Sequence, residues 1–104
     1  MNRKFFDFWI FSLKGYSAAA KEWNRKGKKF TEQGELLEAL ECFTMTISIE
    51  PCYGESYFNR GKVNFDFAKY DEALSDYEAA YQNGYEKGYE SYKELLKLHK
   101  GILI

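Results

Sequence analysis

The feature that most constrains the fold is an internal repeat with a period of 34 residues. Small and aromatic residues recur at this spacing along the chain. The matching pairs are Gly27 with Gly61, Ala39 with Ala73, Trp23 with Tyr57, and Phe43 with Tyr77. A fixed period of this length is typical of stacked supersecondary units. One unit cannot bury its apolar face alone, so neighbouring units must pack against each other.

Each copy of the repeat is predicted to contain two helices. In the first copy, Trp23, Gly27 and Phe30 lie at helical spacing, and Gly34 follows where a left-handed helix end is expected. A second apolar stripe then runs up to Pro51, which cannot continue a helix. The second copy repeats this scheme and ends at Asn83-Gly84, before a last helix that carries Tyr89, Tyr92, Leu95, Leu96 and His99 near one face.

The small recurring residues predict close contact between the two helices of each copy. Gly27 and Gly61 have no side chain, so a partner helix can approach their backbone. Ala39 and Ala73 supply small residues on that partner. Aromatic side chains are expected to fill the space around these contacts, because each can bury on the order of 150–250 Å².

Composition and charge exclude several classes of protein. Of 104 residues, 45% are apolar and 30% charged, which predicts a folded domain rather than a disordered chain. The net charge of −1 gives no electrostatic reason to expect a nucleic-acid partner. No apolar run approaches the roughly 20 residues of a membrane span. The two cysteines are too few for a disulfide framework, which favours a cytoplasmic location.

The sequence predicts no catalytic residue, no metal site and no cofactor. The single histidine, His99, has no visible nucleophilic partner, and a cation suits its place near the end of a helix. Metal binding would need more clustered ligands. The stretch from Gly54 to Val63 does not match a phosphate-binding loop, because its spacing differs and Val63 stands where that loop requires Ser or Thr.

Residues 1–16 form an aromatic-rich segment outside the repeat. Basic residues precede its apolar middle and small residues follow it, as in a signal peptide, but Asp7 and Lys14 interrupt the apolar part. The favoured interpretation is a short docked helix, because a helix that is apolar all round is normally buried. It would fill a groove or pair with a second copy; a place on a membrane surface is the remaining alternative.

The repeat resembles the tetratricopeptide repeat, whose eight signature positions are Trp, Leu, Gly, Tyr, Ala, Phe, Ala and Pro. The first copy has Trp23, Lys26, Gly27, Phe30, Ala39, Phe43, Thr46 and Pro51, and the second has Tyr57, Arg60, Gly61, Asn64, Ala73, Tyr77, Ala80 and Tyr85. Lys26 departs from the pattern in the first copy. In the second copy the departures are Arg60, Asn64 and Tyr85.

This resemblance implies an all-α fold of antiparallel helix-turn-helix repeats, stacked as a short right-handed superhelix. The repeats would cover 20–53 and 54–87, and a capping helix would cover 88–100, all within a domain of residues 17–104.

The resemblance also implies a non-catalytic module that binds a peptide or partner protein on a concave face. One group of such proteins holds the acidic C-terminus of a chaperone with convergent Lys, Arg and Asn side chains, which suit carboxylates. Carried over by position, the expected peptide-binding residues are Asn24, Lys28, Phe58, Asn59, Lys62 and Lys93. Asn24 and Lys28 have the family's residue types in exchanged order, and Tyr89 lacks a charge that the family carries.

Self-association is the alternative function. Phe58 and Phe65 would face the concave groove, which the N-terminal segment of this chain or of a neighbouring copy could then occupy, giving a homodimer in the second case. For Phe65 core packing is an equal alternative, because Asn64 takes the usual aromatic position.

Overall fold

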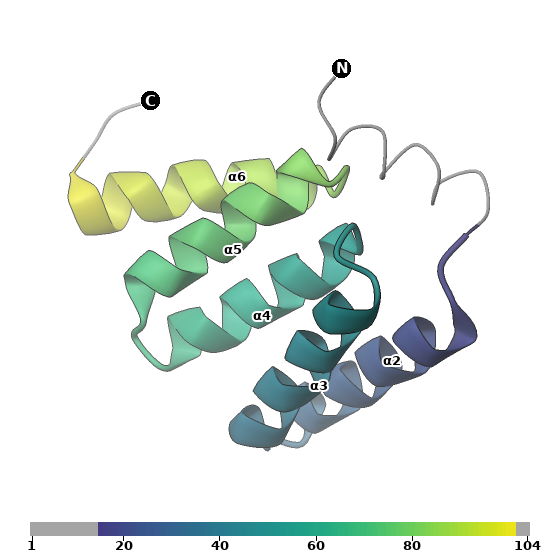
Figure 1. Ribbon diagram of the computed structural model, residues 1–104. Coiled ribbons are helices and arrows are strands. Elements are labelled where there is room, and N and C mark those ends of the chain that lie inside the picture. The colour runs from purple at the N-terminus through teal and green to yellow at the C-terminus, as the bar shows by residue number, and fades with distance from the viewer. Residues whose placement is uncertain (1–14, 102–104) are drawn as a thin grey trace.

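The computed structural model describes residues 15–101, and every regular element in this part of the chain is helical. The elements are α2 (Ala18–Glu32), α3 (Leu36–Ile49), α4 (Gly54–Asp66), α5 (Tyr70–Gln82), α6 (Lys87–Leu95) and the π-helical turn η1 (Leu96–Lys100). Each helix packs beside the next one in the chain, as Figure 1 shows for α2 to α6. The predicted all-α fold of stacked helical repeats is confirmed. Residues 1–16 were predicted to form a docked helix, and positions 1–14 of that segment lie outside the described residues.

Helix α2 begins and ends where its sequence signals lie. The side chain of Ser17 accepts a hydrogen bond from the backbone N–H of Ala20 at 3.1 Å, which satisfies a donor that the first turn leaves open. At the other end Gly34 has a φ of +77°, and the N–H of Glu35 donates to the carbonyl of Phe30 at 2.9 Å. This left-handed end confirms the prediction made from Gly34.

The same left-handed turn closes α4, although no glycine is present there. Ala68 lies 34 residues after Gly34 and has a φ of +59°. The N–H of Lys69 donates to the carbonyl of Asn64 at 2.8 Å, as in the turn after α2. A residue with a side chain is strained at a positive φ. We infer that the helix-turn-helix geometry of the repeat imposes this conformation on Ala68.

The close helix approach predicted from the recurring glycines is confirmed. A methyl group on Gly27 would come within 2.5 Å of the Phe43 ring, and one on Gly61 would come within 2.8 Å of the Tyr77 ring. Phe43 and Tyr77 are both buried. Each aromatic ring therefore lies directly on the backbone of the preceding helix.

Two apolar clusters form the core and join the repeats. Ala39 and Phe43 pack with Val63, which belongs to the second repeat, so α4 closes the first cluster. The second cluster includes Tyr77 of α5 and Leu95 of α6. Each helix pair thus buries its apolar face only because the next helix covers it, as expected for a repeat stack.

A buried polar network explains two departures from the family pattern. Arg60 donates to both carboxylate oxygens of Asp76, at 3.1 and 2.8 Å, and Asn64 donates to the same carboxylate at 2.9 Å. Asp76 is 4% exposed, so these three donors compensate a buried charge. Because Asn64 takes the inward position, its neighbour Phe65 points outward and is 42% exposed. The core alternative for Phe65 is therefore wrong.

The last helix continues into a π-helical turn that returns to α5. Lys100 lies 2.8 Å from the carboxylate of Asp71, and His99 packs on the ring of Tyr70 with centroids 4.9 Å apart. Gly101 then ends the turn with a φ of +68°. None of the helices within residues 15–101 combines the length and the apolar character that crossing a membrane requires.

Candidate functional site

The first helices of the two repeats, α2 and α4, meet through Asn24. This residue is 3% exposed, and both ends of its amide are occupied. Its nitrogen donates to Glu55 at 2.5 Å, while its oxygen accepts from the hydroxyl of Ser56 at 2.6 Å and from Asn59 at 3.4 Å. The structure therefore places Asn24, a predicted peptide contact, in a hydrogen-bonded tie between the repeats.

Three other predicted peptide-binding residues line one hollow of about 190 Å³. Lys28, Asn59 and Lys62 surround it. Thr31, Glu32 and Phe43 complete its lining. The ammonium of Lys28 also lies 3.6 Å from the carboxylate of Glu55, which accepts the hydrogen bond from Asn24 described above. Two lysines and an asparagine thus line one hollow between α2 and α4.

Phe58 lies beside this hollow but packs inward. Its ring centroid is 5.1 Å from that of Tyr85 and 5.7 Å from that of Tyr77, so it adds to the second core cluster. The ammonium of Lys62 covers the ring at 5.4 Å. A cation above an aromatic face is favourable, so Phe58 also holds Lys62 in place.

Lys93, on α6, is not part of the hollow. Its ammonium lies 4.6 Å above the ring of Tyr89 and 3.4 Å from Glu90, both on its own helix. The structure brings together Lys28, Asn59 and Lys62 but leaves Lys93 apart from them. The peptide-binding role of these six residues stays a prediction.

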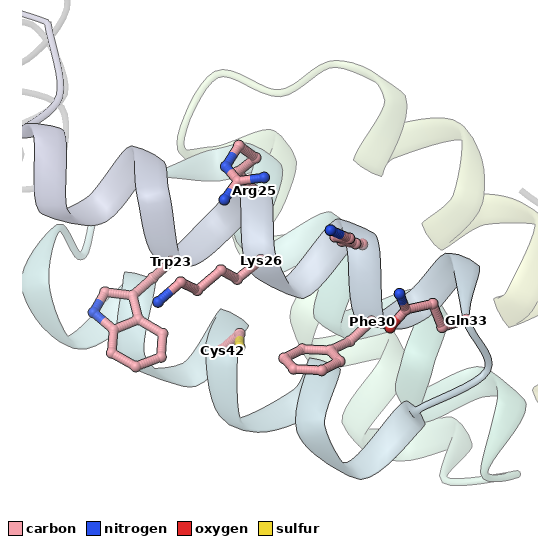
Figure 2. A pocket seen from close by; sticks show the side chains of 7 residues that line it. Trp23, Arg25, Lys26, Phe30, Gln33 and Cys42 are labelled. Atoms are coloured by element: carbon pink, nitrogen blue, oxygen red, sulfur yellow. The ribbon is translucent and has the colours of Figure 1, made fainter.

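A larger hollow of about 550 Å³ lies on the other side of α2. Figure 2 shows Trp23 and Phe30 extending from α2 on either side of Cys42. Lys26 lies between them, with its ammonium 5.0 Å from the centre of the Trp23 ring. The complete lining is Trp23, Arg25, Lys26, Lys29, Phe30, Gln33 and Cys42. This hollow combines an apolar floor with a basic rim.

Burial raises the pKa of two groups near these hollows, the Cys42 thiol and the Tyr53 phenol. The pKa of the Cys42 thiol is raised chiefly by burial, so the thiol is held in its neutral form. Burial and the nearby Glu55 carboxylate raise the pKa of Tyr53. Across residues 15–101, no three or more His, Cys, Asp or Glu side chains gather closely enough to hold a metal ion. The two hollows thus present lysine, asparagine and aromatic side chains at the surface.

None of the predicted sites includes the larger hollow: Lys26 is named above only as a departure from the signature pattern, and aromatic residues such as Trp23 are expected to fill the space between helices. The available signal was the departure of Lys26 from the signature leucine, next to Cys42 where the second repeat has Asp76. Arg60 and Asp76 pair in the second repeat, whereas the equivalent Lys26 and Cys42 cannot form an ion pair, so the two repeats differ at this position.

Part of the chain is similar to a known repeat protein. No protein-family model matches the chain. Over 72 residues the chain is 28% identical to a TPR repeat-containing protein of Schizosaccharomyces pombe, where TPR denotes the tetratricopeptide repeat. The match covers 69% of this chain but only 8% of the length of that protein. This similarity and the stacked helix pairs both support the resemblance to tetratricopeptide repeats.

Proposed function

We propose that this chain is a non-catalytic protein-interaction module that binds an acidic peptide segment of a partner protein between α2 and α4. The observation that carries the proposal is the convergence of Lys28, Asn59 and Lys62 on one hollow. A carboxylate needs several convergent donors, and these side chains offer two ammonium groups and an amide. The resemblance to tetratricopeptide repeats supports the same class of function.

A free C-terminal carboxylate is the favoured form of the ligand. The hollow is small, which suits a single carboxylate group better than a broad surface. Lys62 is exposed and Lys28 is half-exposed, so both ammonium groups are accessible to a peptide from solution. The proposal places the protein in the cytoplasm, where an acidic chaperone tail would be one available partner.

Fluorescence polarisation with a labelled peptide ending in Glu-Glu-Val-Asp tests the proposal. The free-acid and amidated forms are titrated with the full chain. We expect roughly micromolar binding that weakens at least about 10-fold when the terminal carboxylate is amidated, because a charge-assisted hydrogen bond is then lost.

Variants assign the binding to the hollow. Asn59→Ala and Lys62→Ala are each expected to weaken binding, whereas the matched control Lys87→Ala, on the exposed start of α6, leaves it unchanged. Absence of binding at roughly 500 µM protein, far above a micromolar dissociation constant, would reject an acidic C-terminus as the ligand. Equal loss in Lys87→Ala would show nonspecific charge attraction.

A further inference from the structure

The outward face of the α2–α3 pair, here called the front face, is left uncovered by the described helices. In the second repeat the corresponding face packs on α3: Val63 is fully buried there, and Arg60 donates to the hydroxyl of Thr44 at 3.3 Å. The residues 34 positions earlier are Lys29 and Lys26, and both are exposed. The first repeat thus presents charges where the second presents a buried contact.

The two repeats also differ in how they balance the charge at this face. Arg60 is paired with Asp76 in the second repeat, at 2.8 Å. In the first repeat Lys26 replaces Arg60 and Cys42 replaces Asp76. Among the described residues, no carboxylate lies within ion-pair distance of Lys26, whose recorded contact is the Trp23 ring. Lys26 therefore has its cation at the surface without the ion pair that holds Arg60 in the second repeat.

Helix α3 carries acids and apolar residues on the same side. Cys42 shares its helix face with residues at helical spacing. Glu38 lies four residues before it, Met45 three residues after it and Ile49 seven residues after it. Met45 is 43% exposed, Ile49 is 37% exposed, and Glu38 and Glu41 are exposed. The front face thus has an apolar centre, a basic side on α2 and an acidic side on α3.

We propose that the front face binds the front face of a second copy of this chain. A two-fold axis that lies in the interface, parallel to α2 and α3, places α2 of each copy over α3 of the other copy. The cations at Lys26 and Lys29 then lie over the acids at positions 38 and 41 of the other copy. The apolar centres meet in the middle, where the large hollow of Figure 2 accepts exposed side chains.

Self-complementarity favours a second copy over another occupant. A two-fold interface requires one patch to match itself, and opposite charges on the two halves of the front face do this. Tyr16, which leads into α2, stacks on Tyr53 with ring centroids 4.1 Å apart and does not line the large hollow. The interface is separate from the peptide hollow, so it does not depend on the proposed function.

Sedimentation equilibrium of the full chain, from roughly 10 µM to 1 mM, tests the proposal over the range of weak dimers. The wild type is expected to shift from monomer to dimer. Lys26→Glu/Lys29→Glu and Glu38→Lys/Glu41→Lys should each raise the dissociation constant at least about 10-fold, because like charges then face each other. An equimolar mixture of these two variants should restore the dimer. The first variant then has acids on both α2 and α3, the second has cations on both helices, and opposite charges face each other again.

The matched control is Lys87→Glu/Lys97→Glu, which changes two exposed cations of α6 and the turn after it and should dimerise like the wild type. Circular dichroism checks the fold of each variant. Since Glu38 lies in the first turn of α3, Glu41→Lys alone serves if the double variant unfolds. A wild type that stays monomeric at 1 mM overturns the proposal. So does a dimer that both reversals leave intact, or a mixture that stays monomeric.

Discussion

At the scale of single residues, the strongest effect of the fold on chemistry is at Tyr77. Burial, reinforced by the Asp66 and Asp76 carboxylates, raises the pKa of Tyr77 from 10.0 to about 12. Tyr77 is 5% exposed and lies on the backbone of Gly61. Folding therefore favours the neutral phenol over the phenolate.

This shift predicts a loss of stability in alkali. The contribution of Tyr77 is fully present below pH 10 and is lost as the pH rises through about 12, because the unfolded chain releases the proton first. Between pH 9 and pH 11.5, wild type should lose about 2 kcal/mol more unfolding free energy than Tyr77→Phe. Urea unfolding at both pH values measures the difference.

The control for this experiment is Tyr89→Phe, which removes a phenol that is 45% exposed. It should lose stability in alkali to the same extent as the wild type. Identical pH dependence of Tyr77→Phe and wild type would contradict the assignment to Tyr77.

At the scale of the elements, the turn between α4 and α5 has the least favourable residue for its backbone. Ala68 adopts a φ of +59°, where the equivalent positions carry Gly34 and Gly84 with φ of +77° and +90°. All three turns make the same backbone hydrogen bond to the helix that they close. The turn geometry is thus a property of the repeat, and Ala68 takes up that geometry although it is not a glycine.

Ala68→Gly is expected to stabilise the protein by about 1 kcal/mol, because glycine adopts a positive φ without steric strain. Chemical denaturation at neutral pH measures the change. The same substitution in helix α5, Ala79→Gly, should instead destabilise by about 1 kcal/mol, since glycine is a poor helix former. If both substitutions destabilise equally, Ala68 is not strained.

At the scale of the whole molecule, stability is expected to be graded along the stack. Helix α4 packs against both α3 and α5 and is tied to α2 through Asn24. The turn η1, by contrast, contacts α6 as its main neighbour and is held to α5 by exposed groups such as Asp71. Local opening in a repeat stack starts where neighbour contacts are fewest.

Native-state hydrogen exchange should therefore find the slowest amides in α4 and the fastest helical amides in η1. The measurement is made at a dilution where the chain is monomeric, so that front-face contacts do not add protection. Lys100→Ala serves as a probe of the end: it should speed exchange in η1 and leave α4 unchanged. Equal protection in all helices would show that the chain unfolds only as one unit.

Much of this fold was available from the sequence. The 34-residue period predicted two helix pairs, and Gly27 and Gly61 predicted where the helices of each pair come close. These inferences succeed because helix periodicity and the absence of a side chain are local properties. The family resemblance assigned Lys28, Asn59 and Lys62 to one surface, and all three line one hollow, but their peptide-binding role stays a prediction.

The tertiary structure alone decided how the polar residues are used. Asn24 looked like a groove residue, but Ser56, 32 residues away, turns it into a buried tie. Asn64 faces inward and Phe65 outward because Asp76 and Arg60 offer charge and hydrogen bonds at that position. A polar side chain is buried only where distant partners satisfy it. Helix spacing therefore determined which residues share a face, and long-range contacts determined which of them are available to a partner.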